Sequence, residues 1–179
     1  THFKFPSEDD LLDPMLLTNM QEGAKMLISH IGQNDKIFIQ VDADCDGYTS
    51  AAILINYLNC LFPHFVQTHI SYRVHDGKQH GLLVETIPDD VKLVIAPDSS
   101  SSDFEEHEEL SKRGIDVLVL DHHEAEKFSE YACVINNQLC DYPTKSLSGA
   151  GIVYKFCCYL DSLLGFDYAN DYVDLATVG

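Results

Sequence analysis

The amino-acid sequence predicts an α/β fold, a mostly parallel five-stranded sheet flanked by helices. Apolar segments of strand length alternate with segments of helical periodicity, which is the pattern of a sheet built from strand–helix–strand units. The strand segments are apolar at consecutive positions, as expected for strands that are covered on both faces. With 179 residues, 45% of them hydrophobic, the chain is long enough to bury such a core.

In the first half of the chain, helical spacing of apolar residues predicts a helix over residues 14–31. The segment KIFIQV, residues 36–41, then has the composition of a buried strand. Residues 50–61 are apolar on most sides and predict a buried helix that ends before Pro63. Residues 68–74, rich in β-branched and aromatic side chains, predict a second strand, and KLVIA, residues 92–96, a third.

The second half repeats this alternation. A helix is expected from Ser102 onward, where serine and aspartate can cap it. Residues 116–123 and 133–137 predict the fourth and fifth strands, residues 149–164 predict a helix, and a last helix begins near Asp171. We divide the chain into an N-terminal helical lead-in, residues 1–35, and one domain, residues 36–179. Ligands of parallel sheets bind beyond the carboxyl ends of the strands, so function is expected there.

The cysteines and the apolar runs indicate the compartment. Six cysteines form no C-x-x-C pair and no regular framework, which favours reduced thiols in the cytoplasm over disulfides or a zinc site. The longest apolar runs have strand length and are too short to cross a bilayer, so no membrane partner is expected. No signal-peptide pattern is visible, and the start at Thr1 looks like a fragment or a processed end.

The charge limits the choice of substrate. The chain has 29 acidic and 11 basic residues and a net charge of −18, whereas a nucleic-acid binder normally presents a basic surface. Either the substrate is small, or metal ions supply positive charge, or a basic region lies on a missing segment or on a partner protein. A solvated acidic surface that aids solubility explains part of the excess.

The stretch VDADCDG places Asp42, Asp44, Asp46 and Gly47 in the spacing that opens a calcium-binding EF-hand loop. An EF-hand needs a preceding helix and a glutamate at the twelfth position, but here a strand precedes and that position is Ile53. If the segment is extended, its three carboxylates project on one side, and their repulsion favours a bound divalent cation. A solvated acidic turn that caps the next helix is the alternative.

Two further predicted strands end in the same way. KLVIA runs into Asp98, and DVLVL runs into Asp121, His122 and His123. A parallel sheet brings such strand ends side by side, and carboxylates with imidazole suit Mn²⁺ or Mg²⁺ better than a thiolate-preferring ion. Two ions about 3.5–4 Å apart would suit phosphoester hydrolysis by a metal-activated water.

The chain resembles the DHH phosphoesterase superfamily, and within it the RecJ-type single-stranded-DNA exonucleases. The resemblance is carried by three strand ends, in this order: Asp44-Cys45-Asp46-Gly47, Asp98 and Asp121-His122-His123. The stretches PTKSLSGAGIVYKF and YVDLATVG resemble later segments of the same branch, and the resemblance covers about residues 36–179. It implies a catalytic domain that uses two Mn²⁺ or Mg²⁺ ions, digests single-stranded DNA from the 5′ end to 5′-mononucleotides, and serves DNA repair and recombination.

The resemblance also implies roles for single residues. The positions that match the family's metal ligands are Asp44, Asp46, Asp98 and His122. Asp98 is the candidate for bridging two ions, and His123 matches a catalytic residue near the phosphate or the second metal. Asp121 is expected to orient a ligand histidine, and Asp42 matches an aspartate common in the RecJ branch.

Substrate contacts are expected at two places. Arg73 can contact a phosphate, although an ordinary surface arginine is equally compatible with the sequence. Ser148, Gly149 and Gly151 lie where a helix begins, and its backbone N–H groups can hold a phosphate. A glycine-rich turn that lets the helix pack closely is the alternative.

The family's last ligand aspartate normally follows a segment that ends here at Gly179, so it is expected beyond that residue. Asp174 is the nearest carboxylate and is kept as a candidate ligand. The second domain of RecJ proteins, with its basic nucleic-acid-binding region, is absent from this sequence. We expect that domain or a partner protein to supply the basic surface.

Three functions therefore remain in view. A RecJ-like exonuclease on single-stranded DNA is the first. Hydrolysis of short oligonucleotides or cyclic dinucleotides is the second, which the acidity favours because a small substrate needs no basic groove. A non-catalytic DHH-like replication scaffold is the third, although such relatives typically lose the metal-binding residues that this chain keeps.

Overall fold

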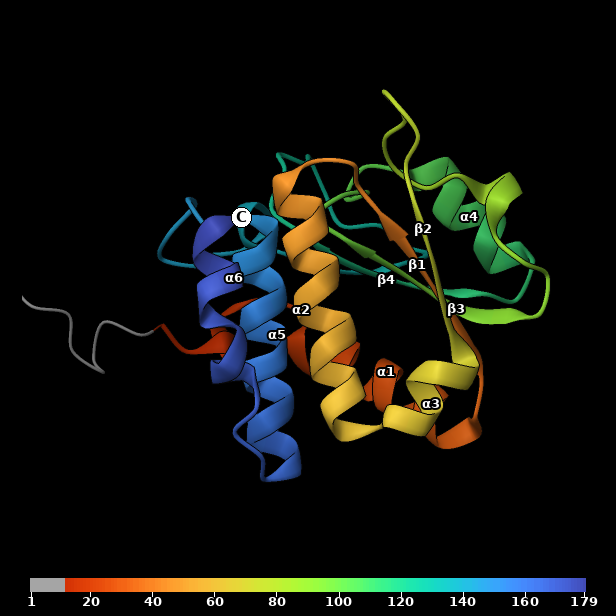
Figure 1. Cartoon of the computed structure of the whole chain (residues 1–179). Coiled ribbons are helices and arrows are strands. Elements are labelled where there is room, and N and C mark those ends of the chain that lie inside the picture. Colours follow the sequence, from red (N-terminus) through yellow and green to blue (C-terminus); the bar gives the residue numbers. More distant parts are fainter. Residues whose placement is uncertain (1–11) are drawn as a thin grey trace, which may run out of the picture.

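The computed structural model describes residues 12–179 and contains a five-stranded sheet in the order β2-β1-β3-β4-β5 (Figure 1). All four strand pairings are parallel, which confirms the predicted α/β class. Residues 1–11 of the expected lead-in lie outside the described residues. The strands are β1 (Lys36–Val41), β2 (Ile70–Val74), β3 (Val91–Pro97), β4 (Asp116–Asp121) and β5 (Cys133–Asn136).

Helices cover both faces of this sheet (Figure 1). One face packs against α1, α2 and α5, and the other against α4 and the loop that precedes β3. The helices are α1 (Met20–Gln33), α2 (Cys45–Leu61), α3 (Pro63–His69), α4 (Phe104–Lys112), α5 (Gly149–Leu164) and α6 (Val173–Val178). Short 3₁₀ turns lie at Pro14–Leu16, Val84–Thr86, Asn137–Leu139 and Ala169–Tyr172.

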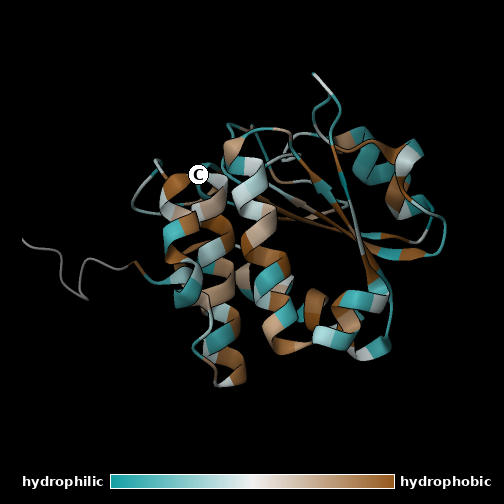
Figure 2. Ribbon diagram, in the orientation of Figure 1, coloured by the Kyte–Doolittle hydropathy of each residue, from teal (hydrophilic) through white to brown (hydrophobic). Residues whose placement is uncertain are grey.

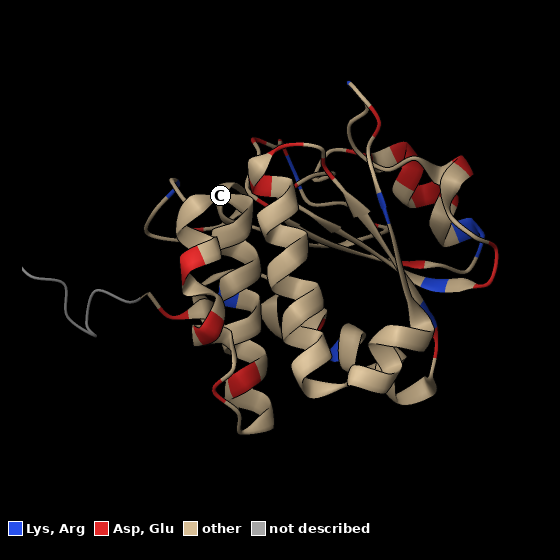
Figure 3. Ribbon diagram, in the orientation of Figure 1, with Lys and Arg blue, Asp and Glu red and all other residues tan. Residues whose placement is uncertain are grey.

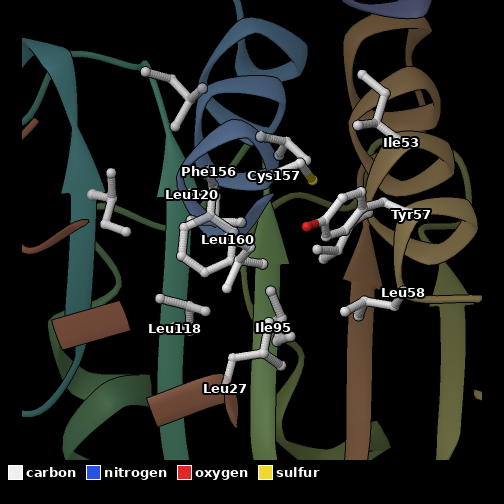
Figure 4. Close-up of a cluster of buried hydrophobic side chains, with 14 of the residues drawn as sticks. Leu27, Ile53, Tyr57, Leu58, Ile95, Leu118, Leu120, Phe156, Cys157 and Leu160 are labelled. Carbon is white, nitrogen blue, oxygen red and sulfur yellow. The ribbon is translucent and has the colours of Figure 1, made fainter. Parts of the chain in front are cut away.

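The core consists of two apolar layers, one on each face of the sheet. Successive side chains of a strand point to opposite faces, so Ile37 and Ile39 of β1 enter one layer and Phe38 enters the other. Figure 4 shows the larger layer, where Tyr57 of α2 and Phe156 of α5 meet the strands. In Figure 2 the strands in the middle of the sheet are mostly hydrophobic. This packing fixes the strand ends from which the candidate site is built.

The start of α2 differs from the prediction. The helix begins at Cys45, five residues before the predicted residue 50, because Asp44 is extended and its carboxylate accepts a hydrogen bond from the Gly47 N–H at 2.8 Å. Asp46 therefore lies in the first helical turn. The segment is therefore not extended throughout, so the condition for three carboxylates on one side is not met, and the alternative of an acidic turn that caps the next helix describes Asp44.

The short helix α3 was not predicted. The sequence indicated a break at Pro63, but proline is well tolerated at the first position of a helix, where its missing N–H costs nothing. A new helix therefore starts at Pro63, and β2 begins at Ile70, two residues later than expected.

A buried hydrogen bond joins α2 to α5. The Tyr57 hydroxyl donates to Asp161 Oδ1 at 2.8 Å, and the Ala169 N–H donates to Asp161 Oδ2 at 2.7 Å. We expect Tyr57→Phe to lower the free energy of unfolding by about 1–3 kcal/mol, because a buried carboxylate oxygen loses its donor. Urea denaturation measures this. Tyr154→Phe, which removes a hydrogen bond to the exposed Asn170, is the control and should cost less; an equal loss would contradict the prediction.

Within residues 12–179, none of the helices combines the length and the apolar character needed to cross a membrane.

Candidate metal centre

The candidate site lies at the carboxyl ends of β1, β3 and β4, which are neighbours in the sheet. Asp98 directly follows β3, and its N–H donates to the Leu120 carbonyl at 2.8 Å, which extends the pairing of β3 with β4. Asp98 and Ser100 both have left-handed backbone angles, with φ of 68° and 80°. Residues other than glycine rarely adopt this conformation, although aspartate tolerates it better than most. The turn brings the Asp98 carboxylate against Gly149 at the start of α5.

His122 faces two of the carboxylates. Its Nε2 lies 3.2 Å from Asp98 Oδ1 and 3.5 Å from Asp46 Oδ2. Its Nδ1 donates to the Leu147 carbonyl at 2.9 Å, because a carbonyl can only accept. The nearby Asp98 carboxylate raises the pKa of His122. Since Leu147 holds the Nδ1 proton, the neutral ring presents its Nε2 lone pair to the space between Asp46 and Asp98, as metal-binding histidines do.

Asp98 provides the test of whether a cation fits. Its side chain is 1% exposed, and neither carboxylate oxygen accepts a hydrogen bond, despite the nearby ring nitrogen of His122. Burial raises the pKa of Asp98 to about 6; the contact with His122 opposes this shift, while the charges of Asp46 and Asp44 add to it. A buried carboxylate without partners is costly unless it meets a cation. Potential ligand atoms of Asp98, His122 and His123 lie within 4.8 Å of one another, so these residues fit an Mn²⁺ or Mg²⁺ ion.

Asp46 joins this cluster to the start of α5. Its two oxygens accept hydrogen bonds from the N–H groups of Gly149 and Ala150, both at 2.7 Å. The Gly151 N–H donates to the Ser148 hydroxyl at 3.1 Å. These N–H groups therefore already have partners within the chain, so the structure does not present them to a phosphate as the sequence suggested. Gly149 instead allows close packing: a Cβ atom there would lie 2.2 Å from Asp98 Oδ1.

Asp121 orients His123 and not His122. It is fully buried, and its Oδ1 accepts from the His123 Nδ1 at 2.8 Å while Oδ2 accepts from the Ser101 N–H at 3.0 Å. Burial alone would raise the pKa of Asp121, but these hydrogen bonds outweigh it and lower the pKa to about 2. The same contact raises the pKa of His123 to about 9. His123 is left with its Nε2 for an ion or a phosphate.

Asp42 lies beside the cluster and has its own histidine partners. Its carboxylate is 3.1 Å from the Nδ1 of buried His75 and 3.3 Å from the Nδ1 of exposed His80. Burial would raise the pKa of Asp42, but the hydrogen bonds from His75, the Ala43 N–H and His80 lower it. Asp42 therefore tethers the loop that follows β2.

Three predicted residues are not joined to the cluster by hydrogen bonds or ion pairs in the described part of the chain. Asp44 is exposed and caps α2, although its charge acts on Asp98. Asp174 is exposed on α6, and its side chain accepts from the adjacent Leu175 N–H. Arg73 is half-buried on the edge strand β2, and its guanidinium has neither kind of partner among residues 12–179.

Two supports of the site, the Leu147 carbonyl and Asn136, were not predicted from the sequence. Asn136 is fully buried at the end of β5, and its amide donates to Ser101 Oγ at 2.8 Å and to the His123 carbonyl at 2.9 Å. The sequence also places a polar residue at the end of the fifth predicted strand, and this pattern could have indicated Asn136. A backbone carbonyl such as that of Leu147 carries no signal in the sequence.

A cavity of about 270 Å³ adjoins the cluster. Its lining residues include Asp42, His80, Ser99–Asp103, Asp121, His123 and Glu124. The surroundings are acidic: in Figure 3 the negative residues occupy α4 and the loops at the strand ends. A cation bound at Asp98 would supply the positive charge that an anionic group needs to enter this space.

The fold and the cluster define an α/β domain of the kind that holds divalent ions at the ends of parallel strands. A family model described as "DHH family, N-terminal domain" matches residues 36–179. The chain therefore belongs to the DHH family.

Similar proteins place it beside the RecJ branch, as the sequence motifs predicted. YorK of the Bacillus subtilis SPbeta prophage, named for single-strand DNA-specific exonuclease activity, is 50% identical over 91% of this chain and 28% of YorK. The single-stranded-DNA-specific exonuclease RecJ of Thermus thermophilus is 30% identical over 99% of this chain and 27% of RecJ.

Solved structures agree. A crystal structure of exonuclease RecJ bound to manganese superposes with a TM-score of 0.80 and 26% identity, over 93% of this chain and 43% of that one. RecJ of Thermus thermophilus with Mn²⁺ superposes with a TM-score of 0.77 and 25% identity, over 94% of this chain and 24% of that one. This chain spans less than a third of the length of YorK and of the Thermus RecJ.

Proposed function

We propose that this chain is the catalytic domain of a metal-dependent phosphodiesterase, a RecJ-like exonuclease that removes 5′-mononucleotides from the 5′ end of single-stranded DNA. The observation that carries the proposal is the buried Asp98 carboxylate, which accepts no hydrogen bond and lies 3.2 Å from His122 Nε2, the ring nitrogen that also lies 3.5 Å from Asp46. Similarity to YorK and to RecJ supports the choice of single-stranded DNA as substrate.

In this proposal Asp46, Asp98 and His122 hold a divalent ion, and Asp44 and His123 lie at the edge of the centre. When bound, Mn²⁺ or Mg²⁺ lowers the pKa of water and stabilises charge on phosphoryl oxygens. The chain's own residues do the positioning. Leu147 fixes the His122 ring, and Gly149 keeps the start of α5 against Asp98.

His123 is proposed to contact the scissile phosphate. Asp121 holds its Nδ1 proton and raises the pKa of the ring to about 9, so the ring is positively charged at neutral pH as long as its Nε2 binds no ion. A charged imidazole beside the cavity would attract a phosphoryl oxygen and could donate a proton from Nε2. Its side chain is 59% exposed, which leaves it open to substrate.

The acidity favours a second candidate, hydrolysis of short oligonucleotides or cyclic dinucleotides. Arg113 is engaged with the carbonyls of Val84 and Ile87 and with Asp89, which leaves Arg73 as the arginine without a side-chain partner among residues 12–179. A long single strand would therefore need basic surface from another domain or a partner protein. We include that surface in the proposal, together with a cytoplasmic location, which the six free thiols support.

Digestion of labelled substrates tests the proposal. A single strand labelled at either end, its duplex and a dinucleotide are incubated with the chain and Mn²⁺, Mg²⁺ or a chelator. We expect shortening of the single strand from the 5′ end with either metal and none with the chelator. Cleavage of the dinucleotide alone would favour the second candidate. Absence of any hydrolysis while Mn²⁺ binds would refute catalysis and favour a scaffold.

His122→Ala is expected to lower Mn²⁺-dependent hydrolysis by more than about 100-fold, because the ion loses its imidazole ligand. The side chain is 28% exposed, so the free energy of unfolding should change by less than about 1 kcal/mol. Calorimetric Mn²⁺ titration and hydrolysis rates measure the effect. His64→Ala, on the exposed face of α3, is the matched control. Activity within threefold of the wild type would remove His122 from the proposed site.

A further inference from the structure

A second cavity lies between α2 and the edge strand β2, and the proposed function does not use it. Its volume is about 230 Å³. The walls are aliphatic: Val41 and Val74 are the last residues of β1 and β2, and Ile55 and two alanines come from α2. No lining residue carries a charge. A cavity below the size of most drug-sized ligand sites, with apolar walls, suits one flat ring system.

Two tyrosines border this cavity and remain largely exposed. Tyr48 of α2 is 50% exposed and Tyr72 of β2 is 62% exposed. Single exposed aromatic residues are common on protein surfaces and need no explanation. Here, however, two of them flank one apolar hollow, from two different elements. Such an arrangement offers aromatic ring faces, in addition to aliphatic walls, to a planar ligand.

The cavity is connected to the candidate metal centre through the chain at the end of β1 and the start of α2. Val41 directly precedes Asp42, and Tyr48 follows Asp46 by two positions in the first turn of α2. Because neighbouring helical residues are about 100° apart, Asp46 and Tyr48 leave the helix on opposite sides. Asp46 accordingly reaches α5, while Tyr48 borders the space beside β2. Both sites are therefore reached from the first turn of one helix.

We propose that this cavity holds a nucleobase of the single-stranded substrate, from a nucleotide close to the phosphate at the metal centre. The inference rests on the proposed function, because it assumes a nucleic-acid substrate. Stacking on aromatic side chains binds every base, since each has a π-face, and it needs no positive charge. A neutral base also avoids the repulsion that a chain of net charge −18 exerts on phosphates.

Asn56 supplies the polar contact of the cavity. Its Nδ2 donates to the Ala52 carbonyl at 2.8 Å, which leaves Oδ1 as an acceptor. A base edge that carries an N–H group can donate to this oxygen. The walls give affinity for any base, and Asn56 adds one hydrogen bond, since every base carries an N–H donor.

Steady-state kinetics with an oligothymidylate and Mn²⁺ test the stacking. Tyr48→Ala and Tyr72→Ala are each expected to raise KM about tenfold or more with kcat unchanged, while Tyr48→Phe and Tyr72→Phe, which keep the rings, stay near the wild type. Tyr131→Ala, which removes another exposed tyrosine far along the chain, is the control. With a strand whose residues at the 5′ end are abasic, the wild type and the alanine variants should have the same KM. Equal KM values for both alanine variants and the wild type would overturn the inference.

Binding without catalysis separates this inference from the proposed function. Thymidine, which has no phosphate, is titrated in a chelator while the methyl signals of Ala51, Ala52 and Ile55 are followed by NMR. We expect these signals to shift in the wild type and in the Phe variants, and to stay unchanged in Tyr48→Ala/Tyr72→Ala. Shifts without hydrolysis of any substrate would leave the base site standing and defeat the nuclease. Hydrolysis without these shifts would support the nuclease and overturn the base site. The cavity would then be assigned to a polypeptide segment.

Discussion

Asp98→Asn is expected to lower Mn²⁺-dependent hydrolysis by more than about 100-fold and, without metal, to stabilise the fold. Asparagine has nearly the same shape and tolerates the left-handed backbone at φ 68°, which alanine would strain. The substitution therefore removes the charge and little else. Loss of Mn²⁺ binding in calorimetry should accompany the loss of turnover.

The stabilisation follows from the buried charge. A pKa of about 6, against 3.8 for the ordinary carboxyl, corresponds to about 3 kcal/mol of unfavourable free energy when Asp98 is ionised. The amide of asparagine also lacks partners, so we expect a gain of about 1–2 kcal/mol in a chelator at pH 7.5. Mn²⁺ should stabilise the wild type against heat and leave the variant unchanged.

The pH dependence has a defined sign. Between about pH 4 and pH 6 the folded protein holds a proton on Asp98 that the unfolded chain has released, so this group's contribution to stability falls as the pH rises. The advantage of Asp98→Asn over the wild type should therefore grow across this window and level off above it. Urea denaturation in a chelator at several pH values measures the difference. A constant difference would mean that Asp98 does not titrate as a buried, unpaired carboxyl.

Gly149→Ala is expected to lower both stability and metal affinity, although it adds a single methyl group. The new Cβ would lie 2.2 Å from Asp98 Oδ1 and 2.6 Å from Asp98 Cβ, and the latter atom is fixed by the backbone. The start of α5 must then move away, which breaks the hydrogen bonds from Gly149 and Ala150 to Asp46. We expect a loss of about 2–4 kcal/mol in unfolding free energy from overpacking and the lost cap.

The same substitution elsewhere provides the control. Gly32 lies in α1, and a Cβ there would meet nothing within 4 Å, so Gly32→Ala should stabilise the protein by up to about 1 kcal/mol. Mn²⁺ titration should show at least about tenfold weaker binding for Gly149→Ala and no change for Gly32→Ala. Unaltered Mn²⁺ affinity in Gly149→Ala would show that α5 does not hold Asp98 in place.

The strands could be predicted from the sequence because their apolar residues are consecutive. KIFIQV matches β1, and the ends of β3 and β4 carry the residues that the sequence placed there. From those ends, the sequence also indicated the proximity of Asp46, Asp98 and His122. The family motifs at these positions added the RecJ branch, which the similar proteins confirm.

The beginning of α2 could not be predicted in the same way, because one carboxylate can serve two purposes. The sequence predicts Asp44 as a metal ligand, and the structure shows that its carboxylate also caps α2. The sequence likewise could not reveal that Asp46 occupies the N–H groups at Gly149, since the two residues are 103 positions apart. The left-handed Ser100 is similarly hidden, because a serine-rich stretch is compatible with many turns.

The hydrogen bonds from α5 to Asp46 connect ion occupancy to the mobility of a helix end. An ion that draws Asp46 toward itself must share that carboxylate with the amide protons of Gly149 and Ala150. The exchange of these two protons with solvent therefore reports on the position of the carboxylate. Their exchange rates will change when the carboxylate shifts, even if no nucleotide is present. Loading of the protein with metal can thus be followed on the backbone itself.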